Sequence, residues 1–260
     1  IKTGYTFDGW NTAANGSGTD YAEGENYTAN VGVTLYAKWT INVFVCGDDV
    51  SFTYNGSPVT YGTVSNATTG KCWLDRNLGA TQKAVASNDS AAYGHLFQWG
   101  RPADGHQVRN SGTQTGQVET ITPGTNTFIL LNWPTDEWSS TDSNGALRSA
   151  YLAKTDGEGI CPAGFRLPTG AEWDAERVSW SSNNATGAFA STLKLPATGY
   201  RYYSINGLNQ VGESGQYWSS TVDATYSPTY SRCLSFAASS GSVNSTARTY
   251  GFAVRCIKED

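Results

Sequence analysis

The segment from Cys161 to Trp180 constrains the fold most, because it joins a tight turn to a clear helix start. It reads CPAGFRLPTGAEWDAERVSW, with a Pro/Gly turn after the cysteine and Pro168 just before a helical pattern. Thr169 and Glu172 have the spacing of a capping box, in which each side chain bonds to the other residue's backbone amide. The spacing therefore predicts a helix that starts directly after Thr169.

The apolar side chains of this helix lie on two faces. Trp173 and Trp180 are seven residues apart and share one face, while Ala171, Ala175 and Val178 lie on the other. Because both faces can contact packed protein, we expect the helix to be wedged into the fold. An amphipathic surface helix is the alternative interpretation.

The cysteines indicate disulfides rather than a metal site. They stand at Cys46, Cys72, Cys161, Cys233 and Cys256, so neither a CxxC motif nor a Cys/His metal spacing occurs. We expect Cys46 to pair with Cys72 across a hairpin, and Cys161 to pair with Cys256, which leaves Cys233 over. Two disulfides imply an oxidising compartment. Five reduced core cysteines are the alternative.

Composition limits the classes of partner. The 260 residues can bury one sizeable core, or one core and a small satellite. The net charge is -5 and no Lys/Arg cluster occurs, which argues against nucleic acid or an anionic membrane as partner. No apolar run approaches the roughly 20 residues that span a bilayer, so we expect no membrane insertion in this segment. Since no methionine occurs, we expect a piece of a longer protein.

Residues 1–40 differ in composition from the rest of the chain. The landmarks are GYTFDGW and LYAKW, with a turn at residues 15–18. This stretch resembles the Listeria-Bacteroides repeat, a small β-rich module of bacterial surface proteins. The family's leading strand is missing before Ile1, so we expect a truncated copy. An N-terminal hairpin belonging to the main domain is the alternative.

From Ile41 onward short strands predominate. Asn55 and Gly56 predict a hairpin turn between alternating apolar residues, and KCWLDRNLGA at residues 71–80 predicts another strand. Residues 88–90 are expected to cap a short helix that carries Tyr93 and Leu96. Residues 101–160 are either a functional insertion or a surface excursion. Residues 216–222, 231–236 and 250–257 read as strands, with polar loops at 223–231 and 238–250.

Six motifs follow one another in residues 41–260, namely KCWLDRNLGA, AAYGHLFQWGRPADGH, CPAGFRLPTGAEW, LPATGYR, YWSST and GFAVRCIK. In this order they resemble the Fibrobacter succinogenes major paralogous domain. The resemblance implies an α+β, C-type lectin-like fold with two main helices, small antiparallel sheets and chain ends that lie close together. In that family the cysteines of CPAG and VRC recur together, which supports pairing Cys161 with Cys256.

The resemblance also bears on activity. The calcium-binding motifs of C-type lectins, EPN, QPD and WND, are absent, so we expect no cofactor, and a structural calcium ion would have no located site. Formylglycine-generating enzymes share a related fold but use two closely spaced cysteines. Here the nearest pair is Cys233 and Cys256, and the predicted disulfide uses one of them. An enzyme of that class is therefore not expected.

A third branch of the fold contains the variable ligand-binding proteins of diversity-generating retroelements. Their diversified positions lie near the C-terminus and are rich in Asn, Ser, Thr, Tyr, Asp, Gly and Ala, as residues 202–250 are here. Surface loops of secreted β proteins favour the same residues, which is the alternative. Tyrosine offers a rigid contact with a polar tip, and Asn adds adaptable hydrogen bonds. The predicted ligand-binding residues are Tyr202, Tyr203, Asn206, Tyr217, Trp218, Asp223, Tyr226, Tyr230, Asn244, Arg248 and Tyr250.

Other polar residues receive structural interpretations. We expect His95 to be packed and hydrogen-bonded. His106 follows Asp104, an arrangement open to acid–base chemistry, but no nucleophile motif such as GxSxG occurs. The carboxylates of residues 48–49, 136–137 and 156–158 are expected in solvent. Asp75, Arg76 and Asn77 interrupt an apolar motif, so we expect them to hold the fold together through hydrogen bonds.

These observations favour a non-enzymatic recognition or adhesion domain, extracellular and either on a bacterial cell surface or secreted. Its C-terminal loops are expected to contact a protein or glycan on another cell or host surface. A structural spacer without a specific ligand is the alternative. A hydrolase or oxidase on the same scaffold is a third possibility.

Overall fold

A computed structural model describes residues 2, 5–29, 31–41, 43–131, 136–204, 207–223, 225 and 228–260. The chain forms two compact units, Ile1–Val45 and Cys46–Asp260. The division lies a few residues after the predicted domain boundary between residues 40 and 41. Each unit is described by itself.

The first unit is one antiparallel sheet in the order β2-β1-β3, with strands β1 (Tyr5–Asn11), β2 (Asp20–Tyr21) and β3 (Tyr36–Ile41). A β-bulge lies between Phe7 and Gly9, where the pairing of β1 with β3 shifts. A bulge changes the face on which the following side chains lie. Phe7 consequently contacts both Trp10 and Trp39, with ring centroids 5.2 Å apart in each pair.

The second unit is an α+β fold of many short strands and few helices. Its helices are η1 (Ser90–Ala92), α1 (Ala146–Leu152), α2 (Gly170–Val178) and α3 (Ala185–Ala190). Its strands are β4 (Val50–Tyr54), β5 (Ser57–Tyr61), β6 (Thr63–Asn66), β7 (Lys71–Leu74), β8 (Phe97–Gln98), β9 (Thr113–Thr115), β10 (Phe128–Leu130), β11 (Phe165–Arg166), β12 (Tyr200–Arg201), β13 (Leu208–Asn209), β14 (Gly215–Val222), β15 (Tyr230–Phe236), β16 (Gly241–Ala247), β17 (Gly251–Phe252) and β18 (Ile257–Lys258). All described pairings in this unit's sheets are antiparallel except that of β9 with β10.

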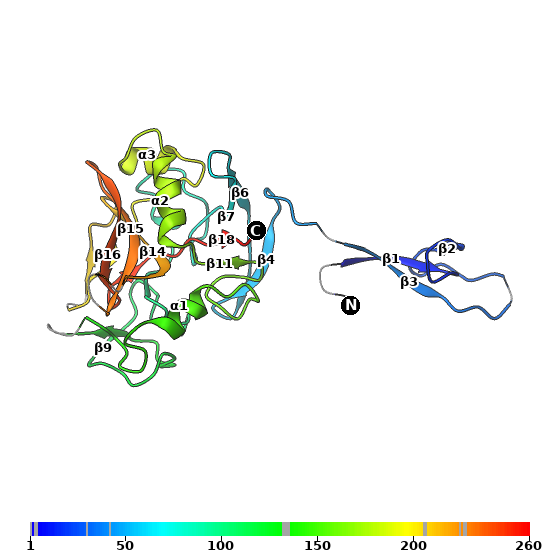
Figure 1. Cartoon of the computed structure of the whole chain (residues 1–260), viewed down its shortest axis with the longest axis horizontal. Coiled ribbons are helices and arrows are strands. Elements are labelled where there is room, and N and C mark those ends of the chain that lie inside the picture. The colour runs from blue at the N-terminus through cyan, green and yellow to red at the C-terminus, as the bar shows by residue number, and fades with distance from the viewer. Residues whose placement is uncertain are drawn as a thin grey trace. The chain divides into compact units, whose positions relative to one another are not determined.

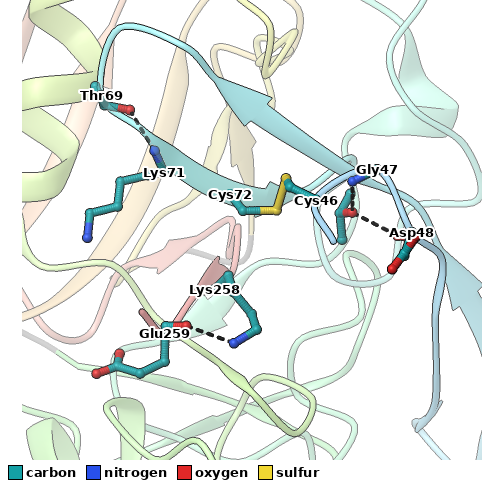
Figure 2. Close-up of a disulfide and its surroundings, with 9 residues drawn as sticks. Cys46, Gly47, Asp48, Thr69, Lys71, Cys72, Lys258 and Glu259 are labelled. Carbon is teal, nitrogen blue, oxygen red and sulfur yellow. Dashed lines mark hydrogen bonds between the residues drawn. A yellow bond between two sulfur atoms is a disulfide. The ribbon is translucent and has the colours of Figure 1, made fainter. Parts of the chain in front are cut away.

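One antiparallel sheet contains strands from the beginning, the middle and the end of the second unit. Its order is β11-β18-β7-β6, so the last strand lies between two strands from earlier in the chain. The disulfide between Cys46 and Cys72 fixes the first residue of the unit to β7 (Figure 2). Both chain ends of the unit are therefore held at this sheet.

The second disulfide joins Cys161, which precedes β11, to Cys256, which precedes β18. Both cystines are those predicted from the sequence. Cys233 is left as a free cysteine, buried in β15. Burial raises the pKa of its thiol to about 12, so the thiol stays protonated and unreactive at neutral pH.

The hairpin of β4 and β5 forms as predicted. Asn55 and Gly56 have positive φ angles of 50° and 77°. Positive φ at both central residues is the signature of the type I′ turn, whose twist matches that of paired strands. The loop has only these two residues, because Tyr54 pairs with Ser57 directly across the turn.

Helix α2 has the predicted capping box, with Thr169 and Glu172 bonded reciprocally. The expectation that the helix is wedged between two packed faces is wrong. Helix α2 lies against the sheet β14-β15-β16 (Figure 1). Trp173 and Trp180 are buried in the main core. The opposite face is in solvent, and Val178 is 68% exposed. The only apolar side chains of the outer face are two alanines and one valine, which expose little apolar surface, so this face needs no second layer of protein over it. The helix is therefore an amphipathic surface helix.

Two predicted elements differ in the structure. The expected helix after residue 90 is only the 3-10 turn η1, because Gly94 takes a φ of +67° against the carbonyl of Leu78. The expected loop at 238–250 contains strand β16, which pairs with β15 along its whole length. Its small polar side chains hide the strand pattern, and pairing with β15 decides the conformation.

Residues 101–160 contribute to the interior as well as to the surface. Glu137 lies in the interior and accepts hydrogen bonds from Arg148 at 2.6 Å and from Arg248 at 2.9 Å. The guanidinium of Arg248 also lies 4.7 Å from the ring centroid of Trp99. The expectation that Glu137 is in solvent is wrong, because two buried arginines require its charge.

Candidate ligand-binding surface

Tyrosines gather where β12 pairs with β17. Arg201 of β12 pairs with Gly251 of β17, which places Tyr202 opposite Tyr250. Side chains alternate along a strand, so Tyr200 and Tyr202 lie on one face while Arg201 lies on the other. Arg201 accordingly turns inward and donates to the hydroxyl of Ser111 at 2.6 Å.

The rings form a continuous cluster. Tyr202 stacks on Tyr203 with centroids 4.9 Å apart, and Tyr250 meets both edge-on at 5.4 and 5.0 Å. Tyr200 lies 5.8 Å from Tyr250. The buried ring of Phe252 contacts the cluster from the protein interior, with its centroid 5.6 Å from that of Tyr250. Offset and edge-to-face pairs of this kind hold the rings in place.

The long insertion supports the edge of the cluster. The amide of Leu131 donates to the carbonyl of Tyr203 at 2.8 Å. Asp136 of the same insertion accepts a hydrogen bond from the hydroxyl of Tyr230, the first residue of β15. We call Tyr200, Tyr202, Tyr203, Tyr230 and Tyr250 the tyrosine surface, and all five are partly exposed.

Burial governs ionisation at this surface. It raises the pKa of Tyr200, Tyr203 and Tyr250, and neighbouring phenols add to the effect. These hydroxyls are therefore neutral and able to donate and accept hydrogen bonds at physiological pH. Burial also raises the pKa of Asp136, although the hydrogen bond from Tyr230 opposes that shift.

Three of the predicted ligand-binding residues belong to the interior. Tyr217 and Arg248 are 0% exposed, and Trp218 is 1% exposed. The indole of Trp218 donates to the carbonyl of Phe97 at 2.7 Å. These side chains are not available to a ligand. Tyr217 and Trp218 lie in the buried part of β14, and Arg248 donates to the buried carboxylate of Glu137.

Asp223 is also buried and has a structural role. Its carboxylate accepts hydrogen bonds from Thr225, Ser245 and Arg232, which connects the end of β14 to β15 and β16. These donors lower the pKa of the Asp223 carboxyl well below its usual range. The side chain is committed to the fold rather than to a ligand.

The remaining predicted residues have separate positions. Asn244 is exposed but lies in the middle of β16, opposite Cys233. It is three residues along the strand from the partner of Tyr230, a distance of about 10 Å. Asn206 and Tyr226 lie outside the described residues. The structure thus brings together Tyr202, Tyr203, Tyr230 and Tyr250.

Sequence reasoning missed Tyr200 and Asp136. The signal for Tyr200 was present, because it precedes Tyr202 by the two-residue period of a strand. Nothing in the sequence near Asp136 connects it with Tyr230, since the two residues are far apart along the chain and meet only through tertiary folding.

The histidines have internal partners. His106 is 0% exposed; its Nδ1 lies 2.7 Å from the carboxylate of Asp104, and its Nε2 accepts from the amide of Gln98 at 3.1 Å. Both ring nitrogens are used, so His106 is not placed to exchange a proton with a substrate. His95 Nδ1 lies 2.8 Å from the hydroxyl of Tyr54, as expected for a packed side chain. Within the described ranges, no group of three or more His, Cys, Asp or Glu could hold a metal ion.

Comparison with known proteins places the N-terminal unit most clearly. Residues 1–38 match the family model of the Listeria-Bacteroides repeat domain, and residues 175–257 match a domain of unknown function, DUF8237. A protein of Evansella cellulosilytica named "Putative Gly-rich membrane protein" is 30% identical over 162 residues, which cover 62% of this chain. The chain spans 16% of the length of that relative. No solved structure matches the chain.

These findings support a bacterial surface-protein context. The Listeria-Bacteroides repeat and the two disulfides agree with an extracellular or surface location. None of the helices found in the described residues has both the length and the apolar character needed to cross a bilayer.

Proposed function

We propose that residues 46–260 form a non-enzymatic recognition domain with a C-type lectin-like fold, which binds a protein or glycan through the tyrosine surface. The observation that carries the proposal is the ring cluster of Tyr200, Tyr202, Tyr203 and Tyr250, four partly exposed tyrosines held by strand pairing and by Phe252. Tyr230 lies near its edge and acts on the pKa of Tyr203. Rigid aromatic groups with polar tips supply contact area at low entropic cost. A stiff scaffold that presents such groups is typical of binding proteins.

The fold assignment in this proposal is supported by three features. Strand β18 lies between β7 and β11, so both ends of the unit meet in one sheet. The cystine of Cys161 and Cys256 is the pair that recurs in the Fibrobacter family. Helix α2 packs on the sheet of β14, β15 and β16, which belongs to the segment where the sequence places variable positions (Figure 1).

Binding is tested with arrays of glycans and of bacterial and host surface proteins. The intact chain is compared with Tyr203→Ala and with Tyr36→Ala, a control that removes a 41% exposed tyrosine from the first unit. We expect one class of array ligand to bind the intact chain and the control, and to lose at least about tenfold in affinity with Tyr203→Ala. If no ligand binds, or if both variants bind alike, the tyrosine surface is not the binding site and the structural spacer is favoured.

The proposal extends to diversification of this surface by a retroelement. Residues 202–250 contain both buried and exposed positions, which makes the idea specific. Gene sequences from sibling cells should vary at exposed positions such as Tyr203 and Asn244, through adenine-rich codons, and should preserve Tyr217, Trp218 and Arg248. Substitutions spread evenly along the chain would contradict diversification and leave ligand binding to be judged by the arrays.

A further inference from the structure

The tyrosine surface contains an anion that the described chain does not neutralise. Asp136 is partly exposed, and within the described residues no Lys or Arg forms an ion pair with it. The neighbouring Glu137, by contrast, is paired with two arginines, at 2.6 and 2.9 Å. One of two adjacent carboxylates is therefore balanced by the fold, while the other faces the tyrosines.

Asp136 lies beside Tyr250, because its backbone carbonyl accepts a hydrogen bond from the hydroxyl of the preceding residue, Thr249, at 3.4 Å. A hydrogen bond with Tyr230 lowers the pKa of the Asp136 carboxyl, and the charge of Asp136 adds to burial in raising the pKa of Tyr203. The faces of aromatic rings carry partial negative charge, so they add to the negative potential of the carboxylate. Among the described residues, no Lys or Arg side chain lies over any ring of the tyrosine surface.

The shape of the surface favours a planar cation. Tyr202 and Tyr203 are stacked, with an interplanar angle of 25°, and Tyr250 stands edge-on to both. A guanidinium can stack on a ring face and at the same time donate two hydrogen bonds to a carboxylate. The fold itself uses this combination, since the guanidinium of Arg148 lies 5.4 Å from the ring centroid of Trp99 and donates to both carboxylate oxygens of Glu137, at 2.6 and 2.7 Å.

We infer that the tyrosine surface receives an arginine side chain of a protein partner, with its guanidinium against the rings of Tyr203 or Tyr250 and donating to Asp136. The inference rests on the proposed function and narrows it to a protein that presents an exposed arginine. A partly exposed surface formed by several side chains suits a residue carried by a folded partner, because the rest of that partner can cover the outer tyrosines.

The test compares two probes of the same shape. Nα-acetyl-arginine methylamide and Nα-acetyl-citrulline methylamide differ at the terminal group, which is charged only in arginine. Each is titrated into the intact chain carrying 13C-labelled tyrosine, and aromatic shifts are followed by NMR. We expect saturable shifts of Tyr203 and Tyr250 with arginine in the millimolar range, and binding of citrulline weaker by on the order of tenfold.

Two variants locate the charge effect. Asp136→Asn keeps the shape of the side chain and removes its charge, while Glu119→Gln removes an exposed carboxylate elsewhere on the insertion. Arginine affinity should fall to the level of citrulline in Asp136→Asn and stay unchanged in Glu119→Gln. In the free Asp136→Asn protein, resonances of Tyr200 and Tyr202 that stay at their parent positions show that the ring cluster is intact. Those of Tyr203 and Tyr230 are expected to move, because both residues lose the charge of Asp136.

The outcomes separate this inference from the proposed function. Equal affinity for arginine and citrulline, or no shift with either, overturns the arginine site. An array ligand that binds through Tyr203 but carries no cationic group also overturns it, while the proposed function stands. Loss of arginine binding in Glu119→Gln as well as in Asp136→Asn would mean that the effect is long-range electrostatics rather than a site.

Discussion

Asp75 and Arg76 form an ion pair that is largely buried. The carboxylate binds Nε at 2.7 Å and Nη2 at 2.9 Å, and the side chains are 15% and 19% exposed. The guanidinium also lies 4.9 Å from the ring centroid of Tyr61. The hydrogen bonds that Arg76 donates to Asp75 raise the pKa of Arg76, so the arginine is a cation at all ordinary pH values.

Asp75→Ala should therefore destabilise the second unit. Removing one partner leaves a partly buried cation, and we expect a loss of about 1–3 kcal/mol in the free energy of unfolding. Thermal and urea denaturation measure the change. Asp174→Ala is the control, because Asp174 pairs with Arg177 but is 53% exposed and should contribute less than about 0.5 kcal/mol. Equal effects of the two substitutions would contradict a structural role for Asp75.

His106 is expected to make the stability depend on pH. Burial lowers its pKa to about 4, even though the hydrogen bond to Asp104 opposes the shift and Arg101 and Arg201 reinforce it. The unfolded chain binds this proton at a pKa of about 6.5. Stability from neutral His106 is thus complete above pH 6.5 and is lost as the pH falls toward about 4, by at most about 3 kcal/mol.

The protonation state of His106 can be observed directly. Long-range 1H–15N NMR spectra should show the proton on Nδ1, directed at Asp104, and no titration of the ring above pH 5. Glu172 acts in a lower window, because Arg166 and the cap hold its pKa at about 2 despite burial. A His106 signal that titrates near pH 6.5 would show that the ring is solvated and would remove the predicted slope.

Residue types in the sequence predicted which polar side chains need hydrogen-bond partners. They did not predict whether a side chain of a strand faces the core or the solvent. Asn77 was expected to hold the fold, and it binds the carbonyl of Tyr93 at 3.1 Å and accepts from Arg255 at 3.0 Å. Tyr217 and Arg248 were expected at a surface and are buried. Their positions depend on the register of β14 and on a distant carboxylate, which local composition does not encode.

At the scale of elements, the N-terminal cap of α2 is the feature that the sequence predicts most clearly. Thr169 Oγ1 accepts a hydrogen bond from the amide of Glu172 at 3.2 Å, and the carboxylate of Glu172 accepts one from the amide of Thr169 at 2.7 Å. The same carboxylate binds Arg166 at 2.8 Å, which connects the helix start to β11. The cap therefore fixes both the helix and its attachment to the terminal sheet.

Thr169→Ala should destabilise the second unit by about 1 kcal/mol, because the amide of Glu172 loses its acceptor. Thr169→Ser keeps the hydroxyl and should stay within about 0.5 kcal/mol of the parent. Urea denaturation followed by tryptophan fluorescence reports the change, since Trp173 lies on this helix in the core. Similar losses in the two variants would assign the effect to the methyl group of threonine rather than to the cap.

Elements with local signals were predicted, and elements made by pairing were not. The turn at Asn55 and Gly56 specifies its hairpin through residues that accept positive φ. Strand β16 has the sequence GSVNSTA, in which Val243 packs against the main core and Ala247 is buried at the end of the strand. Its strand conformation comes from the ladder with β15, so a composition typical of loops gave the wrong prediction.

For the whole second unit, the free thiol is a measure of how tightly the core is closed. Cys233 is 2% exposed in β15, and the other four cysteines form disulfides. A thiol reagent such as DTNB should find no reactive group in the native chain. In urea without reductant it should find one thiol per chain. Rapid labelling of the native protein would mean that the sheet β14-β15-β16 opens readily, and more than one thiol would mean that a disulfide is absent.

The cystine of Cys161 and Cys256 has the largest effect expected on the second unit. It closes a loop of 95 residues and joins the central segment to the sheet that holds both chain ends. Loop-closure entropy for this length predicts a loss of about 4–5 kcal/mol in the double variant Cys161→Ala, Cys256→Ala. The double variant Cys46→Ala, Cys72→Ala opens a separation of 26 residues and should lose about 1 kcal/mol less. Urea denaturation compares the two, and a larger loss from the shorter loop would show that fixing the start of the unit matters more than closing its core.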